Sequence, residues 1–391
     1  MEHDRKKAKE AIDEKSRLIN AEKIERFISL RDRAFALRDQ HVINHEALEL
    51  LNVLSEVNPE LYSMFNYRRR LLAGLWSAPS GDQAAVEALS ERKRSMLEEE
   101  LLLNTRVIMK DYKVYSAWLH RRWILGEMTP ERRREVLLEE LKRCEGLLKL
   151  DERNFHAWGY RRYVTAMLRS SGDFSDWDEL KFTEAKINKN LSNYSAWHNR
   201  ALLLQHWTRS LFTSISTPAA QSPPNDATKE APHRLFDKIF TFATSETELL
   251  KKSFYCDPGD QSPWIYAANL LSIMASVATA THATDFHAKA RSITQHMLCV
   301  FGKASRELYE DMHQERSDMQ CEETLGQEPF WPLWLQQHLA AHYHAEIEAA
   351  SRATGPSLML PMTNEQMLEQ LMKMDPQRRG LYEEQLRLAC E

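Results

Sequence analysis

Residues 151–165 read DERNFHAWGYRRYVT, and the same pattern returns four more times along the 391-residue chain. Each copy has an aromatic anchor with Asp or Asn seven residues before it. Most copies also have Arg three residues after the anchor and an aliphatic residue seven after it. A unit of about 40 residues that has to hold two helices predicts a solenoid of helix pairs. The anchors of the five copies are Phe65, Trp118, Trp158, Trp197 and Trp264.

The spacing within a copy assigns a structure to each of its parts. The Asp or Asn is expected to end one helix and start a turn, because its short side chain bonds nearby backbone amides. Serines two residues before the anchor are expected to cap the second helix. These are Ser63, Ser116, Ser195 and Ser262.

From the anchor onward, positions 0, 3, 4 and 7 share one face of a helix. The anchors are therefore expected to lie in the core, with Trp118, Trp158, Trp197 and Trp264 as its large side chains. The arginines at position 3 are expected to be structural, holding carbonyls or carboxylates between helix layers. The clearest of these are Arg121, Arg161 and Arg200.

The segments between anchors complete an all-helical pattern. Residues 46–57, 94–109, 134–150 and 179–191 have apolar residues at helical spacing, and no segment alternates like a strand. The predicted fold is all-α: an alpha-alpha superhelix whose helical hairpins resemble tetratricopeptide repeats. One domain is expected across 1–391, with a degenerate sixth copy on Trp331. A proline-rich flexible insertion is expected at 209–234.

Composition excludes several classes of protein. A net charge of −5 argues against a general nucleic-acid binder, and the basic runs at 68–70 and 132–134 are interpreted as helix faces or ion-pairing partners. The five cysteines are widely separated and form no CxxC motif, so no disulfide framework or zinc knuckle is indicated. The charged N-terminus has no signal-peptide core, and the apolar stretch at 266–278 is shorter than the ~20 residues of a membrane span. We therefore expect a cytoplasmic chain that does not span a membrane.

Motifs for self-contained catalysis are missing from the sequence. It has no GxSxG, Walker loop, HExxH or GxGxxG. His338 and His342 stand one helical turn apart, with His344 beside them, and two such side chains can share a metal. No third ligand accompanies them in a known arrangement, so a solvated or packed helix face is the preferred interpretation. We expect no catalytic residue and no metal site in this chain.

The repeats resemble those of protein prenyltransferase alpha subunits. The resemblance is fullest in NYSAWHNRALL at 193–203 and NFHAWGYRRYV at 154–164. Three stretches look like the alpha chain of the type II, or Rab, geranylgeranyltransferase: 151–162, 257–264 and 373–388. Arg153 stands where the alpha chain shared by the farnesyl and type I enzymes has a lysine that reaches the isoprenoid diphosphate, which favours the Rab interpretation.

The resemblance implies one half of an enzyme. A barrel-shaped beta subunit would hold the zinc and most of the isoprenoid pocket. The pair would transfer geranylgeranyl from geranylgeranyl diphosphate to C-terminal cysteines of Rab GTPases presented by a Rab escort protein. Without the immunoglobulin-like and leucine-rich parts of longer members, this chain resembles the short form.

The site residues implied by the resemblance stand at the third copy. Arg153, Asn154 and Phe155 are candidates for the diphosphate rim. A salt bridge is the alternative for Arg153. A helix-start role is the alternative for Asn154, since Asn193 holds the same place in the next copy. Two other functions remain open: the shared alpha subunit of the farnesyl and type I enzymes, and a helical-repeat adaptor that takes part in no enzyme.

Overall fold

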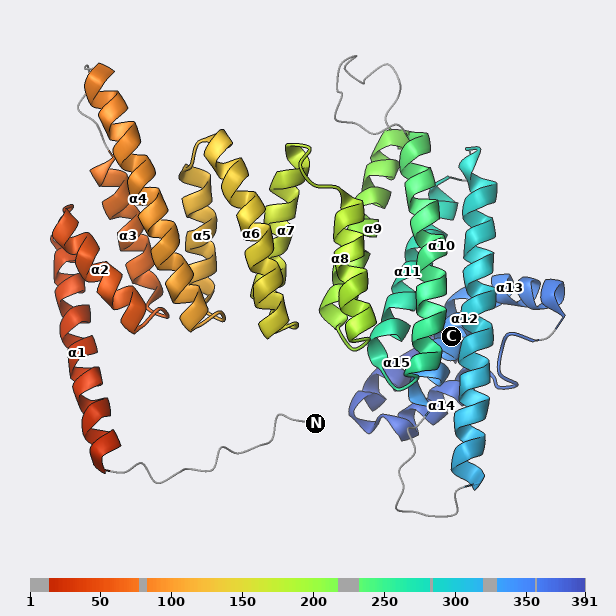
Figure 1. Ribbon diagram of the computed structural model, residues 1–391. Coiled ribbons are helices and arrows are strands. Elements are labelled where there is room, and N and C mark those ends of the chain that lie inside the picture. Colours follow the sequence, from red (N-terminus) through yellow and green to blue (C-terminus); the bar gives the residue numbers. More distant parts are fainter. Residues whose placement is uncertain are drawn as a thin grey trace. The chain divides into compact units, whose positions relative to one another are not determined.

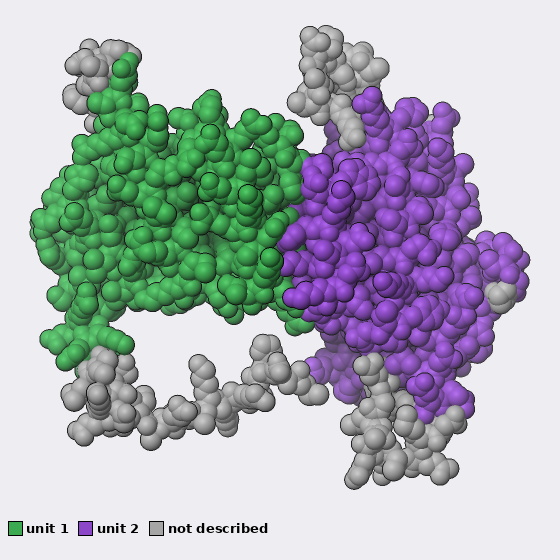
Figure 2. Space-filling view, viewed as in Figure 1, with its two compact units in different colours: residues 1–174 green, residues 175–391 purple. Residues whose placement is uncertain are grey.

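The computed structural model describes residues 14–76, 83–216, 232–281, 284–318, 329–355 and 357–390. Over these ranges the chain forms fifteen α-helices and one short 3-10 helix, and no β-strand (Figure 1). The prediction of an all-α fold is confirmed. The chain divides into two compact units, residues 1–174 and 175–391 (Figure 2).

The first unit contains three of the five predicted copies, each a pair of helices, and Figure 1 shows these pairs following one another in chain order. They are preceded by one long helix. The bounds are α1 (Glu14–Asp39), α2 (His45–Val57), α3 (Tyr62–Leu75), α4 (Gln83–Lys110), α5 (Tyr115–Glu127), α6 (Pro130–Leu150) and α7 (Phe155–Ser170).

The second unit contains the other two copies, followed by helices outside the repeat. The bounds are α8 (Asp176–Lys189), α9 (Tyr194–Ser216), α10 (Pro232–Cys256), α11 (Gln261–Ala280), α12 (Phe286–Asp318), α13 (Phe330–Thr354), α14 (Asn364–Met374), η2 (Pro376–Arg378) and α15 (Arg379–Cys390). The first helices predicted from the sequence correspond to α2, α4, α6 and α8.

The turn inside each helix pair is built the same way five times. The Asp or Asn seven residues before the anchor follows the first helix, and its side-chain Oδ1 accepts a hydrogen bond from the backbone amide two residues later, at 2.9–3.2 Å. The predicted helix-ending turn is confirmed in all five copies, at Asn58, Asp111, Asp151, Asn190 and Asp257.

The predicted N-caps were wrong by two residues. Each second helix begins three residues before its anchor, so the serines already lie in the first helical turn. The side chains that cap α7, α9 and α11 stand four residues before the anchor: Asn154 accepts from the amides of residues 156 and 157, Asn193 from residue 196 and Asp260 from residue 262. Ser116 instead donates its hydroxyl hydrogen bond to the Pro59 carbonyl, at 3.1 Å. The helices α3 and α5 follow Leu61 and Val114 and have no side-chain cap. Before α9 and α11 the sequence offered two polar residues, and only the backbone position separates them.

Both ends of the predicted insertion at 209–234 are helical. Residues 209–216 continue α9, residues 232–234 begin α10, and 217–231 lie outside the described residues. Trp331 is the second residue of α13 and is partly exposed, so it does not hold the buried place of the other anchors. The single domain across 1–391 stays a prediction.

One helix of the second unit is apolar along its length. Among the described helices, α11 alone is long and apolar enough to cross a membrane by length and composition, and 56% of the apolar window is buried inside the protein. It is longer than the apolar stretch at 266–278 because the helix also includes residues 261–265 and 279–280. Its buried side chains, among them Trp264 and Leu271, belong to the repeat core.

Candidate functional site

Every anchor is buried, and the four tryptophans also close the turn that precedes them. Each indole Nε1 donates to the carbonyl six residues earlier, at 2.8–3.0 Å: Trp118, Trp158, Trp197 and Trp264. Phe65 lacks an N–H and has only the packing role. A buried indole N–H needs an acceptor, and the turn carbonyl supplies it, so the anchor fixes the angle between the paired helices as well as filling the core.

A buried polar triad ties neighbouring copies together. Arg121 on α5 forms a two-bond pair with Glu140 on α6, at 2.5 and 2.7 Å. Tyr160 on α7 donates its hydroxyl hydrogen bond to the same carboxylate, at 2.8 Å. All three side chains are buried. The carboxylate therefore joins one copy's arginine to the next copy's second helix.

The same arrangement appears in two other places. Arg68 pairs with Glu100, which also bonds His120. In the second unit Arg200 pairs with Glu246, which accepts from the Tyr266 hydroxyl at 2.7 Å. The position-3 arginines thus contact carboxylates between helices.

The carboxylates were missed at the level of sequence. Glu100, Glu140, Glu179 and Glu246 all stand 18 residues before the next anchor, and all are buried. This constant offset was available in the sequence. It lies outside the fifteen-residue window that defines the copies, and it becomes visible only when the copies are aligned over their first helices.

The triads hold fixed charge states. Burial alone would raise the pKa of Glu100, but Arg68 and His120 lower it to about 2. Burial lowers the pKa of His120. The neutral ring fits its contacts, since Nε2 faces the Glu100 carboxylate while Nδ1 accepts from Arg69 at 3.3 Å. Burial and Glu140 raise the pKa of Tyr160 well above its usual value, so its phenol remains a donor at every physiological pH.

The three rim candidates lie at one turn but in different environments. Arg153 is exposed at the turn between α6 and α7, and its backbone amide donates to Asp151 Oδ1 at 3.1 Å. Asn154 is buried, and its side chain both caps α7 and donates to the Tyr112 carbonyl at 3.4 Å. That geometry agrees with the helix-start interpretation and leaves the amide engaged. Phe155 is exposed, with its ring centroid 5.8 Å from that of Tyr115.

Phe155 is one of a series of exposed aromatic residues at equivalent positions. In the first unit Tyr62, Tyr115 and Phe155, each the first residue of a second helix, have 59%, 62% and 57% of their surface exposed. Tyr194 holds the same place in α9 of the second unit, with 51% exposed. The aromatic character of this position is evident in the sequence, but its exposure is not, because an aromatic residue next to a buried anchor is ordinarily assigned to the core.

The basic run at 132–134 is fully paired. Arg132 bonds Glu98 at 2.7 Å, Arg133 donates to carbonyls at the end of α5, and Arg134 pairs with Asp173. The interpretation of this run as ion-pairing partners is confirmed for Arg132 and Arg134, whereas Arg133 holds backbone carbonyls.

The three histidines of α13 have different surroundings. The rings of His338 and His342 lie 4.6 Å apart, and burial together with His342 lowers the pKa of His338 to about 4. His344 is exposed and faces Glu348 at 3.6 Å. In the part of the chain that the structure describes, no three His, Cys, Asp or Glu side chains are grouped so that they could hold a metal.

Comparisons with known proteins bear on the repeats. A family model described as protein prenyltransferase alpha subunit repeat matches residues 97–128, 137–168 and 176–207, which correspond to α4–α5, α6–α7 and α8–α9. The structure also resembles the solved structure titled Candida albicans protein geranylgeranyltransferase-I complexed with GGPP. That match has a TM-score of 0.51 and 16% identity, covering 93% of this chain and 90% of the other, and it bears on the fold alone.

Relatives in the curated set carry the name geranylgeranyl transferase type-2 subunit alpha. The Candida albicans protein is 28% identical over 286 residues, covering 70% of this chain and 73% of the relative. The Homo sapiens protein is 32% identical over 265 residues, covering 68% of this chain. The Saccharomyces cerevisiae protein is 35% identical over 190 residues, covering 48% of this chain. This chain spans 40% of the human relative's length and 54% of the yeast relative's.

Matched repeats, the all-helical fold and relatives from yeasts to mammals give one answer. The chain carries the repeats of the protein prenyltransferase alpha subunit family.

Proposed function

We propose that this chain is the alpha subunit of a type II, or Rab, geranylgeranyltransferase. With a beta subunit it transfers the geranylgeranyl group from geranylgeranyl diphosphate to C-terminal cysteines of Rab GTPases presented by an escort protein. The curated relatives share this subunit's name. The zinc is assigned to the beta subunit, and the enzyme to the cytoplasm.

The exposed aromatic position is the observation that carries the proposal. Large aromatic side chains are costly to leave in water and are enriched at the centres of protein interfaces. Tyr62, Tyr115 and Phe155 recur at the start of successive second helices, where the Asx turn and the anchor hold the backbone rigidly. Such a row is preorganised for a partner, and it supports a chain that works as one half of a heterodimer.

Arg153 is proposed to contact the diphosphate. It is exposed, it immediately precedes the cap residue of α7, and it stands two residues before the exposed Phe155. The turn amide fixes its backbone at 3.1 Å from Asp151 Oδ1, so the guanidinium is presented from a rigid base. An arginine there supplies a planar fork of donors, which suits phosphate oxygens.

The experiment compares two turns of the same construction. Lys113 holds in the preceding copy the place that Arg153 holds in the third, with its amide on Asp111 Oδ1 at 2.9 Å. The chain is coexpressed with a beta subunit of the family and assayed for labelling of an intact Rab with its escort. Arg153→Ala is expected to lower kcat/KM about tenfold or more, with Arg153→Lys partly active and Lys113→Ala close to wild type.

The assay also separates the alternatives. Labelling of a CaaX peptide without an escort would identify the shared farnesyl and type I chain. Failure to copurify any beta subunit, with a stable chain alone, would identify the adaptor. For the interface, Tyr115→Ser is expected to weaken copurification of the beta subunit. Leu138→Ser, at an exposed residue of α6, is the control. Equal retention of the beta subunit by both variants would contradict the proposed interface.

A further inference from the structure

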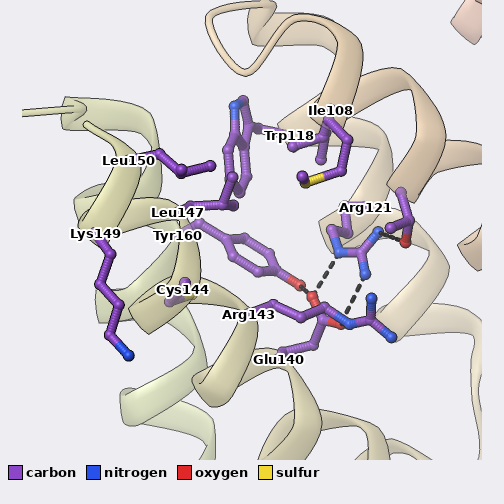
Figure 3. Close-up of a pocket in the computed structure, with 13 residues that line it drawn as sticks. Ile108, Trp118, Arg121, Glu140, Arg143, Cys144, Leu147, Lys149, Leu150 and Tyr160 are labelled. Atoms are coloured by element: carbon purple, nitrogen blue, oxygen red, sulfur yellow. Dashed lines mark hydrogen bonds and ion pairs between the residues drawn. The ribbon is translucent and has the colours of Figure 1, made fainter. Parts of the chain in front are cut away.

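A pocket of about 400 Å³ lies within the first unit, lined by residues of α4, α5, α6 and α7 (Figure 3). Ile108 and Trp118 line it on one side, with Leu147 and Leu150 of α6 facing them. At one end the lining becomes polar, where Arg143 lies beside the Arg121–Glu140 pair. The pocket therefore has an apolar body and a charged end.

Two arginines, Arg121 and Arg143, and one carboxylate, Glu140, line the charged end of the pocket. Glu140 is the one carboxylate there, and its oxygens already accept from Arg121 and from Tyr160. Arg143 adds only its Nε, 3.1 Å from Glu140 Oε1, and its Nη2 is 3.8 Å from the exposed Glu139. Since 40% of the Arg143 side chain and 57% of the Glu139 side chain are exposed, their 3.8 Å ion pair is weak, and an incoming acceptor can replace Glu139 at the Arg143 terminal nitrogens.

The apolar body exists because α6 contributes small residues at this point. Gly146 lines the pocket, and a Cβ added there would meet nothing within 4 Å. The corresponding interval between α2 and α4 holds a smaller pocket, of about 270 Å³, with Asn52, Arg68 and Glu100 in its lining. Arg106 of α4 also lines that pocket, and it reaches across to Glu56 of α2, at 2.8 Å. The pocket between α4 and α6 is thus the larger and the more apolar of the two.

We propose that this pocket binds a medium-chain fatty acid, with its hydrocarbon between α4 and α6 and its carboxylate on Arg143. At ~30 Å³ for each water-sized group, about 400 Å³ holds roughly a dozen non-hydrogen atoms. A guanidinium accepts one carboxylate in a fork of two parallel hydrogen bonds. A diphosphate would bring more negative charge close to Glu140, so the singly charged head group fits better. This proposal stands independently of the prenyl transfer reaction.

The test measures binding of radiolabelled dodecanoate to the purified full-length chain by equilibrium dialysis. Saturable binding of one molecule per chain is expected. Gly146→Leu fills the pocket and is expected to weaken binding at least tenfold. Because leucine is a better helix former than glycine, this variant is expected to melt no lower than wild type. Gly126→Leu, on α5, is the matched control, since a Cβ there also meets nothing within 4 Å.

A second pair of measurements tests the head group. Arg143→Met keeps an unbranched stem and removes the charge, so it is expected to weaken dodecanoate binding about tenfold while leaving dodecanol binding unchanged. No saturable dodecanoate binding, or equal binding by Gly146→Leu and Gly126→Leu, would overturn the proposal. Tighter competition by geranylgeranyl diphosphate than by unlabelled dodecanoate would overturn the choice of a carboxylate and identify a prenyl diphosphate site.

Discussion

Replacing Glu140 by alanine removes the centre of a buried triad, and its cost follows from what remains. Arg121 loses both acceptors of its Nε and Nη2 atoms and keeps only those on Nη1, among them Asn104 Oδ1 and Thr105 Oγ1, each at 3.1 Å. The Tyr160 hydroxyl loses its acceptor, Glu140 Oε2. Removing one partner of a buried ion pair costs about 3–5 kcal/mol, because the other charge stays desolvated.

The measurement is urea unfolding of the full-length chain followed by far-UV circular dichroism, with thermal unfolding as a second readout. If the first unit unfolds cooperatively, the loss corresponds to a melting temperature lower by roughly 6–20 °C. Glu139→Ala is the control. Glu139 precedes Glu140 on the same helix, but 57% of its side chain is exposed and its nearest cation is 3.8 Å away. Its cost is expected to stay within about 0.5 kcal/mol.

A double-mutant cycle tests the reason as well as the size. Arg121→Met combined with Glu140→Met replaces the pair by apolar side chains and strands neither charge. The double variant is expected to be more stable than either single variant. Additive losses would show that the two residues stabilise the fold separately, and a Glu140→Ala variant as stable as Glu139→Ala would refute the triad's structural role.

Three further outcomes are expected from the repeat. Trp158→Phe keeps most of the packing but removes the hydrogen bond from the indole to the turn carbonyl. It should lower the free energy of unfolding in urea by about 1–2 kcal/mol, against about 3–5 kcal/mol for Trp158→Ala. Equal losses in the two variants would show that the indole hydrogen bond does not contribute to stability. Asn154→Ala should cost ~1 kcal/mol through the lost cap. Arg153→Ala, at an exposed residue, should cost less, within about 0.5 kcal/mol. The reverse order would contradict the assignment of the cap. The pKa of Glu100 is about 2 in the folded protein, against an ordinary 4.5. The ionised carboxylate therefore contributes its full stabilisation above about pH 4.5, and this contribution is lost as the pH falls toward 2. Glu100→Gln should flatten that part of an acid-unfolding curve, and an unchanged curve would contradict the depressed pKa.

The sequence predicted the parts of the fold that depend on near neighbours. The Asx turn, the buried anchor and its aliphatic partner all lie within fifteen residues, so their spacing follows from helix geometry alone. The buried triads were not predicted from the sequence, because each triad joins residues of different copies. Arg121 finds its carboxylate 19 residues away and Arg200 finds its own 46 away. The number of residues between an arginine and its carboxylate is therefore not constant. The constant spacing is the one of 18 residues between each carboxylate and the anchor that follows it.

The candidate site was harder to predict, because its residues differ from their neighbours in exposure and not in type. Asn154 and Arg153 are adjacent in the sequence, yet one caps a helix and the other faces solvent. Exposure depends on where the helix starts, and the predicted start was two residues late. The pocket between α4 and α6 depends on small side chains at one interval, which resemble ordinary variation in an amphipathic helix.

Structure and function are separated within the repeat by position. Hydrogen bonds within the chain engage the turn residue, the anchor, the arginine and the carboxylate of each copy. A substitution at any of these positions therefore changes stability before it changes activity. The cap residues of α7, α9 and α11 are engaged as well, because their side chains accept hydrogen bonds from backbone amides of the first helical turn. Two exposed positions also recur: the first residue of each second helix and, in the first three copies, the residue before its cap. Phe155 and Arg153 hold these two positions in the third copy. The exposed aromatic first residue recurs in four copies, whereas the residue before the cap differs from copy to copy. Partner contact should therefore be shared among several copies, and substrate contact confined to single copies. Binding of the beta subunit should therefore weaken step by step as Tyr62→Ser, Tyr115→Ser and Phe155→Ser are combined. Loss of prenyl transfer should instead follow substitution of Arg153 alone.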